Sequence, residues 1–307
     1  MPLLVAVATA APAQVAPDPP PVAPALPQPE SPGEDIAFLP VDERMTVPVQ
    51  IAGAGPFRFV IDTGAQRTVI GRELAGRLGL PAGGDIRLTA MTGTSSVPTV
   101  VIPSISISTL GGKRIHAPAL EERHLGASGL LGIDSLQGHS VGIDFDRRVM
   151  AVTPATRRPS RLRREPGEVV VRARSLFGQL VVTDAYVGAQ RVRVVLDTGS
   201  SVTIGNEALR RRVARKGEAG QPIHMLSVTG ETLTAPYGTI ARVKLGPVTI
   251  ESLPVAFFDV TPFARFGLAD KPAMLLGMDA LRLFRRVDID FANREVRMLL
   301  PRNVPMG

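Results

Sequence analysis

The sequence FVIDTGA at residues 59–65 decides the fold, because it recurs as VVLDTGS at residues 194–200 of this 307-residue chain. In each copy an apolar, β-prone run leads into an Asp-Thr-Gly turn and so presents Asp62 or Asp197 at the end of a strand. A second apolar triplet follows each turn. A single Asp-Thr-Gly is usually a plain turn in which the aspartate caps the backbone. Two copies in matching surroundings indicate a repeated scaffold.

Four further features follow each turn in the same order: a short helix, a polar glycine-containing segment, an apolar Leu-Leu-Gly and a closing strand. The glycine in polar company is typical of a hairpin tip. The paired segments are residues 71–80 and 206–213, 92–94 and 229–231, 130–134 and 275–279, and 141–145 and 287–291. The sequence therefore predicts a duplicated unit, with longer loops in the second copy.

With these motifs the chain resembles the retropepsin-like aspartic proteases of the exported bacterial type, with two retropepsin-type units fused in one chain. The resemblance covers about residues 42–300. It implies an all-β fold of two β-barrel lobes, related by an approximate two-fold axis, with a substrate cleft between them. The many Val, Ile and Thr residues around the turns, and the 30 Gly and 28 Pro in the chain, also favour a β-rich fold.

The resemblance also implies which residues form the site. Asp62 and Asp197 would be the catalytic pair, and Thr63 and Thr198 would hydrogen-bond across the interface between the lobes. The residues implied to support the catalytic turns are Thr63, Gly64, Ala65, Thr198, Gly199 and Ser200. Those implied to form a flap over the substrate are Thr92, Gly93, Thr94, Thr229, Gly230 and Glu231. Those implied to form a psi-shaped loop beside the turns are Leu131, Gly132, Leu276 and Gly277.

Peptide hydrolysis explains why two aspartates would be needed. Water must lose a proton while the carbonyl oxygen gains one, and a carboxylate paired with a carboxylic acid performs both tasks. Two carboxyls about 3 Å apart share one proton over a useful pH range. We therefore expect an aspartic endopeptidase that binds a protein or peptide substrate in extended form between the lobes.

Two alternatives from other classes stay open on the sequence alone. One is a non-catalytic envelope protein that keeps the aspartic protease fold to bind peptides or cell-wall material. The other is a basic scaffold that acts only through its Arg-rich connector, since basic clusters attract polyanions. The intact Asp-Thr-Gly turns favour the protease over both.

The chain divides into five predicted segments. Residues 1–13 are an apolar run typical of a signal peptide remnant, with a disordered apolar tail as the alternative, and residues 14–41 are a Pro/Ala-rich disordered linker. Residues 42–153 and 169–307 are the two lobes, joined by an Arg/Pro-rich connector at residues 154–168. The apolar start predicts a periplasmic or secreted protein.

Composition narrows the partners. The formal net charge is +7, but only 4% of residues are aromatic and none is Trp, which argues against nucleic-acid binding. No apolar run is long enough for a transmembrane span. The four histidines lack metal-ligand spacing, and we expect neither metal nor cofactor. Because one chain carries both aspartates, we expect a monomer.

The two turns differ at their fourth residue, which is Ala65 in the first and Ser200 in the second. A hydroxyl beside a carboxylate can hydrogen-bond to its ionised form and lower its pKa. Asp197 is therefore predicted to ionise more readily than Asp62. The alternative is that the Ser200 hydroxyl points elsewhere.

Overall fold

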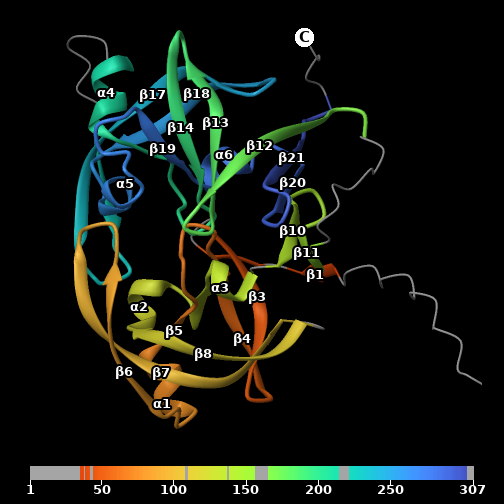
Figure 1. The fold of residues 1–307 in the computed structure, drawn as a ribbon, viewed down its shortest axis with the longest axis vertical. Helices are drawn as coiled ribbons and strands as arrows, with labels where there is room; N and C mark the ends of the chain where they lie inside the picture. Colours follow the sequence, from red (N-terminus) through yellow and green to blue (C-terminus); the bar gives the residue numbers. More distant parts are fainter. Residues whose placement is uncertain are drawn as a thin grey trace, which may run out of the picture. The chain divides into compact units, whose positions relative to one another are not determined.

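The described part of the chain is built mainly from β-strands arranged in two sheets. The computed structural model describes residues 35–37, 39–41, 44–107, 110–136, 138–155, 165–213 and 221–302. Within these ranges an eight-stranded sheet belongs to the first unit, and a thirteen-stranded sheet contains the second unit together with strands that both units share. This agrees with the predicted all-β fold of two lobes (Figure 1).

The first unit consists of strands β2–β9 and three short helices. Its elements are β2 (Leu39–Val41), β3 (Arg44–Ile51), β4 (Ala54–Ile61), β5 (Val69–Gly71), α1 (Arg72–Arg77), β6 (Ala82–Thr89), β7 (Thr94–Ile107), β8 (Leu110–Leu120), α2 (Glu122–Leu125), β9 (Gly129–Leu131) and α3 (Ile133–Leu136). The sheet order is β2-β3-β4-β9-β5-β8-β7-β6, with an additional pairing of β3 with β7.

The second unit repeats this plan strand for strand. Its elements are β12 (Glu168–Leu176), β13 (Gln179–Val187), β14 (Gln190–Leu196), β15 (Ile204–Gly205), α4 (Glu207–Val213), β16 (Gln221–Leu226), β17 (Thr232–Leu245), β18 (Val248–Phe257), α5 (Thr261–Arg265), β19 (Ala273–Leu276) and α6 (Met278–Leu281). The order β12-β13-β14-β19-β15-β18-β17-β16, with the extra β13–β17 pairing, matches the first unit. The predicted short helices are confirmed as α1 and α4.

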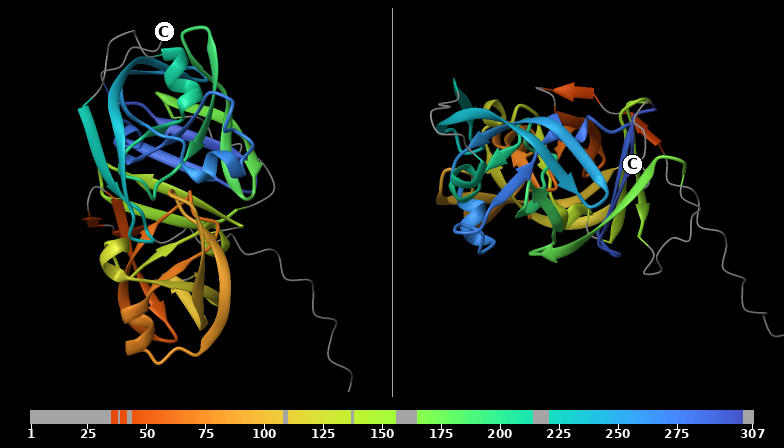
Figure 2. Two further views of the ribbon diagram at one scale, coloured as in Figure 1. Left: turned by 90° about the vertical axis from the view of Figure 1, so that its left-hand side faces the viewer. Right: turned by 90° about the horizontal axis from the view of Figure 1, so that it is seen from above.

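The remaining strands join the two units. They are β1 (Asp35–Ala37), β10 (His139–Asp144), β11 (Val149–Pro154), β20 (Arg286–Asp290) and β21 (Glu295–Leu299), and they run in the order β1-β11-β10-β20-β21-β12. At the centre Gly142 pairs with Asp288, flanked by Val141 with Ile289 and Ile143 with Val287. This register is symmetric about the Gly142–Asp288 pair, as a two-fold relation between the units requires. The left view of Figure 2 shows the orange-to-yellow first half of the chain and the green-to-blue second half apart from each other.

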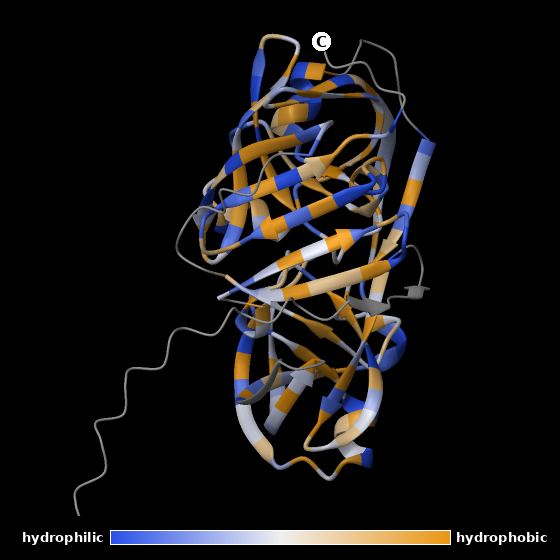
Figure 3. Ribbon diagram, turned by 90° about the vertical axis from the view of Figure 1, so that its right-hand side faces the viewer, coloured by the Kyte–Doolittle hydropathy of each residue, from blue (hydrophilic) through white to orange (hydrophobic). Residues whose placement is uncertain are grey.

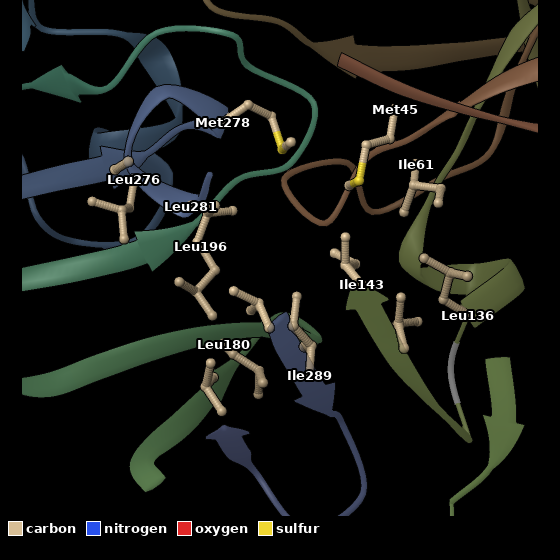
Figure 4. Close-up of a cluster of buried hydrophobic side chains, with 14 of the residues drawn as sticks. Met45, Ile61, Leu136, Ile143, Leu180, Leu196, Leu276, Met278, Leu281 and Ile289 are labelled. Atoms are coloured by element: carbon tan, nitrogen blue, oxygen red, sulfur yellow. The ribbon is translucent and has the colours of Figure 1, made fainter. Parts of the chain in front are cut away.

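Hydrophobic and hydrophilic residues alternate along many of the strands, as the colouring in Figure 3 shows, and this alternation directs the apolar side chains to one face of a sheet. In β10 and β20 the apolar side chains Val141, Ile143, Val287 and Ile289 are fully buried. Figure 4 shows Ile143 and Ile289 in one cluster with side chains from both units, among them Met45, Leu196 and Leu276. Because one apolar cluster is shared by both units, burying it stabilises the units together.

The prediction of a disordered linker over residues 14–41 was wrong for residues 35–37 and 39–41, which form strands. Residues 35–37 form β1, which pairs with β11, and residues 39–41 form β2, which pairs with β3. Ile36, Leu39 and Val41 are β-prone residues, and this short segment adds to the edge of each sheet, with β1 at the edge of the thirteen-stranded sheet and β2 at that of the eight-stranded sheet. The predicted signal peptide remnant and residues 156–164 of the predicted connector lie outside the described residues.

Candidate active site

The two Asp-Thr-Gly turns begin where the central strands of the units end. β4 ends at Ile61 and β14 at Leu196, so that Asp62 and Asp197 follow directly. The backbone N–H of Asp62 donates to the carbonyl oxygen of Leu131 at 3.0 Å, and that of Asp197 donates to Leu276 at 3.0 Å. The Leu-Leu-Gly segments therefore lie beside the turns, on strands parallel to β4 and β14.

The threonines of the two turns form reciprocal hydrogen bonds between the units. The Thr63 N–H donates to Thr198 Oγ1 at 3.1 Å, and the Thr198 N–H donates to Thr63 Oγ1 at 3.1 Å. Each hydroxyl in turn donates to the opposite strand, Thr63 to the Leu196 carbonyl at 3.0 Å and Thr198 to the Ile61 carbonyl at 2.8 Å. Both threonines are at most 2% exposed. Buried, fully paired bonds of this kind hold the two turns in a fixed position.

The glycines of the turns let each aspartate approach the opposite turn. A Cβ atom on Gly64 would lie 2.5 Å from Asp197 Oδ1, and one on Gly199 would lie 2.2 Å from Asp62 Cγ. Real Cβ atoms do not approach this closely, so each carboxyl occupies space that only a glycine leaves open. The two carboxyls are thereby brought together across the interface between the units.

The surroundings favour one shared proton on the two carboxyls. Asp62 Oδ1 accepts N–H bonds from Gly64 at 2.9 Å and Ala65 at 2.8 Å. Asp197 Oδ1 accepts one from Gly199 at 3.0 Å, and the backbone N–H of Ser200 also acts to lower the pKa of Asp197. Burial raises the pKa of Asp62. Burial and, next, the negative charge of Asp62 raise the pKa of Asp197 to about 7. Burial of two carboxyls side by side therefore favours one retained proton on the pair below neutrality, and the pKa of about 7 for Asp197 is consistent with its being held there.

The prediction that the Ser200 hydroxyl makes Asp197 the readier base was wrong. Ser200 Oγ donates to the carbonyl oxygen of Val202 at 2.7 Å, and the Val202 N–H points back at Ser200 Oγ at 3.4 Å. A hydroxyl that is turned into its own loop in this way is not available to Asp197. The alternative, that the Ser200 hydroxyl points away from Asp197, is confirmed.

A cleft of about 560 Å³ lies over the two turns. Side chains of both units line it, including Val69 and Leu130 from the first unit and Val195 and Leu275 from the second. Asp62 and Asp197 also line the cleft and are only partly exposed. The cleft is thus apolar near its floor, with the two carboxyls as polar groups that converge on it.

The residues predicted to form a flap lie at the tips of two hairpins. In the β6–β7 hairpin the Ala90 N–H donates to the Gly93 carbonyl at 2.8 Å and closes the tip, which contains Thr92. In the β16–β17 hairpin the Ser227 N–H donates to the Glu231 carbonyl at 2.8 Å. The tips touch each other, because the Thr92 hydroxyl lies 3.2 Å from Glu231 Oε2 and 3.4 Å from Ser227 Oγ. Thr94, Thr229 and Gly230 belong to the same two tips.

Each hairpin tip rests on the unit to which it does not belong. Met91 packs against buried apolar side chains of the second unit, and its carbonyl accepts the N–H of Thr261 at 2.9 Å. Val228 packs against an apolar cluster of the first unit. A Cβ on Gly230 would lie 2.5 Å from the His124 ring of α2. The hairpins therefore cross over the cleft in opposite directions.

A second layer of hydrogen bonds supports the turns. The Thr68 N–H and hydroxyl both donate to Asp134 Oδ1, at 2.8 and 2.7 Å, and the Gly132 N–H donates to Thr68 Oγ1 at 3.1 Å. This ties the Leu-Leu-Gly segment to the strand that leaves the turn. The corresponding residues of the second unit, bonded through the same donor groups, are Asp279, Thr203 and Gly277. In the sequence Asp134 and Asp279 were noted only because each follows a Leu-Leu-Gly segment. Their recurrence in both copies was the signal that could have identified them as residues that support the turns.

Two residues that line the cleft were not predicted, because neither belongs to a recognisable motif in the sequence. Arg44 and Gln179 open β3 and β13, and both line the cleft. The Gln179 side-chain amide donates to the Gly64 carbonyl, and one Arg44 N–H donates to the Leu125 carbonyl at 2.9 Å. Arg44 and Gln179 occupy equivalent positions in the two copies, and aligning the copies could have paired them. Because their residue types differ, neither forms a recurring motif.

Neither a metal centre nor a membrane helix is found in the part of the chain that the structure describes. No three His, Cys, Asp or Glu side chains there gather closely enough to hold a metal ion. Among the same residues, every helix is too short or too polar to cross a bilayer.

Fold and site together define a duplicated β protein in which two Asp-Thr-Gly turns meet. A family model described as Aspartyl protease matches this chain at residues 47–135 and again at residues 182–280, which is more than half of its length. The chain therefore belongs to the aspartyl protease family, with two retropepsin-like units fused in one chain, and the predicted resemblance is confirmed. A search of curated proteins found no match. Family membership supports a function of the protease type.

The Thr198→Val variant tests the reciprocal hydrogen bonds. Valine keeps the shape but loses the hydroxyl that accepts from Thr63 N–H and donates to the Ile61 carbonyl, and both groups are buried. We expect the free energy of unfolding to fall by about 2–4 kcal/mol in urea titrations. Thr239→Val, at an exposed position in β17, is the matched control and should change it by less than about 0.5 kcal/mol. Equal effects of the two variants would show that the reciprocal bonds do not hold the units together.

Proposed function

We propose that this protein is an aspartic endopeptidase that hydrolyses peptide bonds with Asp62 and Asp197 as a catalytic pair. The observation that carries the proposal is the packing of each carboxyl against the glycine of the opposite turn. A structural turn would not need two aspartates from separate units in this position. Two coupled carboxyls with raised pKa values in a cleft are typical of acid–base catalysis.

The two aspartates take different roles in this proposal. Asp62, which accepts two backbone N–H bonds, is the carboxylate that removes a proton from water. Asp197 holds the shared proton and donates it to the carbonyl oxygen of the scissile bond. As water attacks, the carbonyl becomes a tetrahedral diol. Its collapse breaks the C–N bond: the departing nitrogen takes up the proton that Asp62 removed from water, and a diol hydroxyl returns a proton to Asp197 as the carboxylic acid product forms.

The substrate is a peptide in extended conformation along the cleft. The two hairpins cross above it, and the edges of β6–β7 and β16–β17 offer backbone groups for strand-like pairing. Because the tips of the hairpins touch and rest on the opposite units, they must separate before a chain can reach Asp62 and Asp197. This favours flexible segments of a substrate over folded ones.

Export and assembly belong to the same proposal. We propose that the protein is periplasmic or secreted. We also propose that it acts as a monomer, because a single chain carries both aspartates. The segment on which the export prediction depends, residues 1–13, lies outside the described residues.

The variants Asp62→Asn and Asp197→Asn test the catalytic pair. Each removes one ionisable group without changing the shape, so cleavage of an unstructured protein such as casein should fall below about a tenth of the wild-type rate in both. Asp85→Asn, exposed in β6 and outside the cleft, is the control and should cleave at the wild-type rate. If either variant retained more activity, the shared pair would not be the catalyst. If the wild-type protein bound peptides without cutting them, a non-catalytic binding protein would be favoured.

The pH dependence of kcat/KM tests the protonation of the pair. The raised pKa of Asp197, about 7, keeps its proton bound below neutrality, and the proton is lost as the pH rises through that value. We therefore expect kcat/KM to decline above about pH 7, and to decline again at acidic pH as Asp62 becomes protonated. A rate that keeps rising through pH 8 would contradict a protonated Asp197 in the active form.

A further inference from the structure

The cleft is rich in cationic side chains and poor in acidic ones. Over the whole chain 35 Lys and Arg residues stand against 28 Asp and Glu, which is near balance. Among the described residues that line the cleft, the only carboxylates are Asp62 and Asp197 themselves. The basic residues that line the cleft are Arg44, Arg67, Arg87, Arg123, Arg265, His124 and His224. The general excess of basic residues in the chain does not account for such an imbalance.

Arg44 is a basic residue of the cleft whose charge acts on both carboxyls of the catalytic pair. It is half-buried at the start of β3, and its positive charge lowers the pKa of both Asp62 and Asp197 against the effect of burial. One of its N–H groups donates to the Leu125 carbonyl, which fixes the guanidinium beside α2. A guanidinium has five N–H donors, and among the described residues only the Leu125 carbonyl accepts a bond from that of Arg44, so the others can bind a substrate group.

Arg67 and Arg87 are exposed at the cleft, and neither has an acidic partner among the described residues. Arg265 donates to the Gln66 side chain and lies 5.7 Å from the centre of the Phe177 ring. Amide and aromatic partners hold this guanidinium in place without neutralising its charge. Among the described residues, Glu121 is the acidic partner of two basic residues of the cleft, Arg123 at 2.5 Å and His124 at 3.8 Å.

Arg67, Arg87 and Arg265 have no acidic partner among the described residues, and arginines of this kind in a concave site favour one class of ligand. Low-dielectric walls focus their field into the cleft, and a guanidinium binds a carboxylate through two parallel hydrogen bonds. We propose that the cleft selects peptides carrying Glu or Asp side chains on either side of the scissile bond, with Arg44 as the main specificity-determining residue and Arg87 and Arg67 as further anchors. This inference rests on the proposed endopeptidase function for its cleavage readout.

Matched peptides test the preference. A library of random peptides cut at pH 5.5 and read by mass spectrometry should show Glu and Asp enriched near the cut. For the best site, kcat/KM of the Glu peptide should exceed that of the peptide with Gln in its place by at least about fivefold. Arg44→Gln should remove most of this ratio, and 0.5 M NaCl should reduce it by screening. Arg58→Gln, which removes one exposed arginine of β4 outside the cleft, should leave the ratio unchanged.

Binding separates this inference from the proposed function. The Asp197→Asn protein is titrated with the same fluorescent Glu and Gln peptides, and we expect tighter binding of the Glu peptide, with the difference lost when Arg44→Gln is added. Cleavage or binding of both peptides with equal efficiency would overturn the acidic preference while leaving the protease intact. Tighter binding of the Glu peptide without any cleavage by the wild-type protein would support the preference and refute the endopeptidase.

Discussion

The reciprocal hydrogen bonds between Thr63 and Thr198 are the constraint on which the rest of the structure depends. They join residues 135 positions apart in the sequence and fix the ends of β4 and β14 against each other. Once the two turns are fixed, the carboxyls of Asp62 and Asp197 have space only over the opposite glycines. The raised pKa values and the position of the cleft follow from this arrangement, because both arise where the two units meet.

Fusion of two units in one chain allows equivalent positions to differ. Arg44 and Gln179 open equivalent strands, yet one brings a positive charge to the cleft and the other a neutral amide. Likewise the hydroxyl of Ser200 bonds within its own loop where the first turn has Ala65. A pair of identical chains related by a two-fold axis would carry the same residue at both places. The fused arrangement can therefore assign different roles to its two aspartates and different charges to the two sides of its cleft.

The sequence alone predicted the features that depend on local pattern. The strand-turn runs, the Leu-Leu-Gly segments and the short helices recur within each unit, so periodicity and turn chemistry were sufficient to find them. The linker was overextended to residue 41, because strand pairing at residues 35–41 depends on distant partners. The crossing of Met91 and Val228 onto opposite units, and the direction of the Ser200 hydroxyl, also depend on contacts between segments far apart in the chain. Arg44 carried no signal, since a single arginine at a strand start has no characteristic pattern.

The central claim is that one chain completes one catalytic site. Active-site titration with a statine-type transition-state mimic, together with sedimentation of the complex, tests it most directly. We expect one tightly bound inhibitor per chain on a monomeric protein, and a specific activity that does not change on dilution. One inhibitor per two chains, with activity lost as the protein is diluted, would show instead that the Asp-Thr-Gly turns pair between chains.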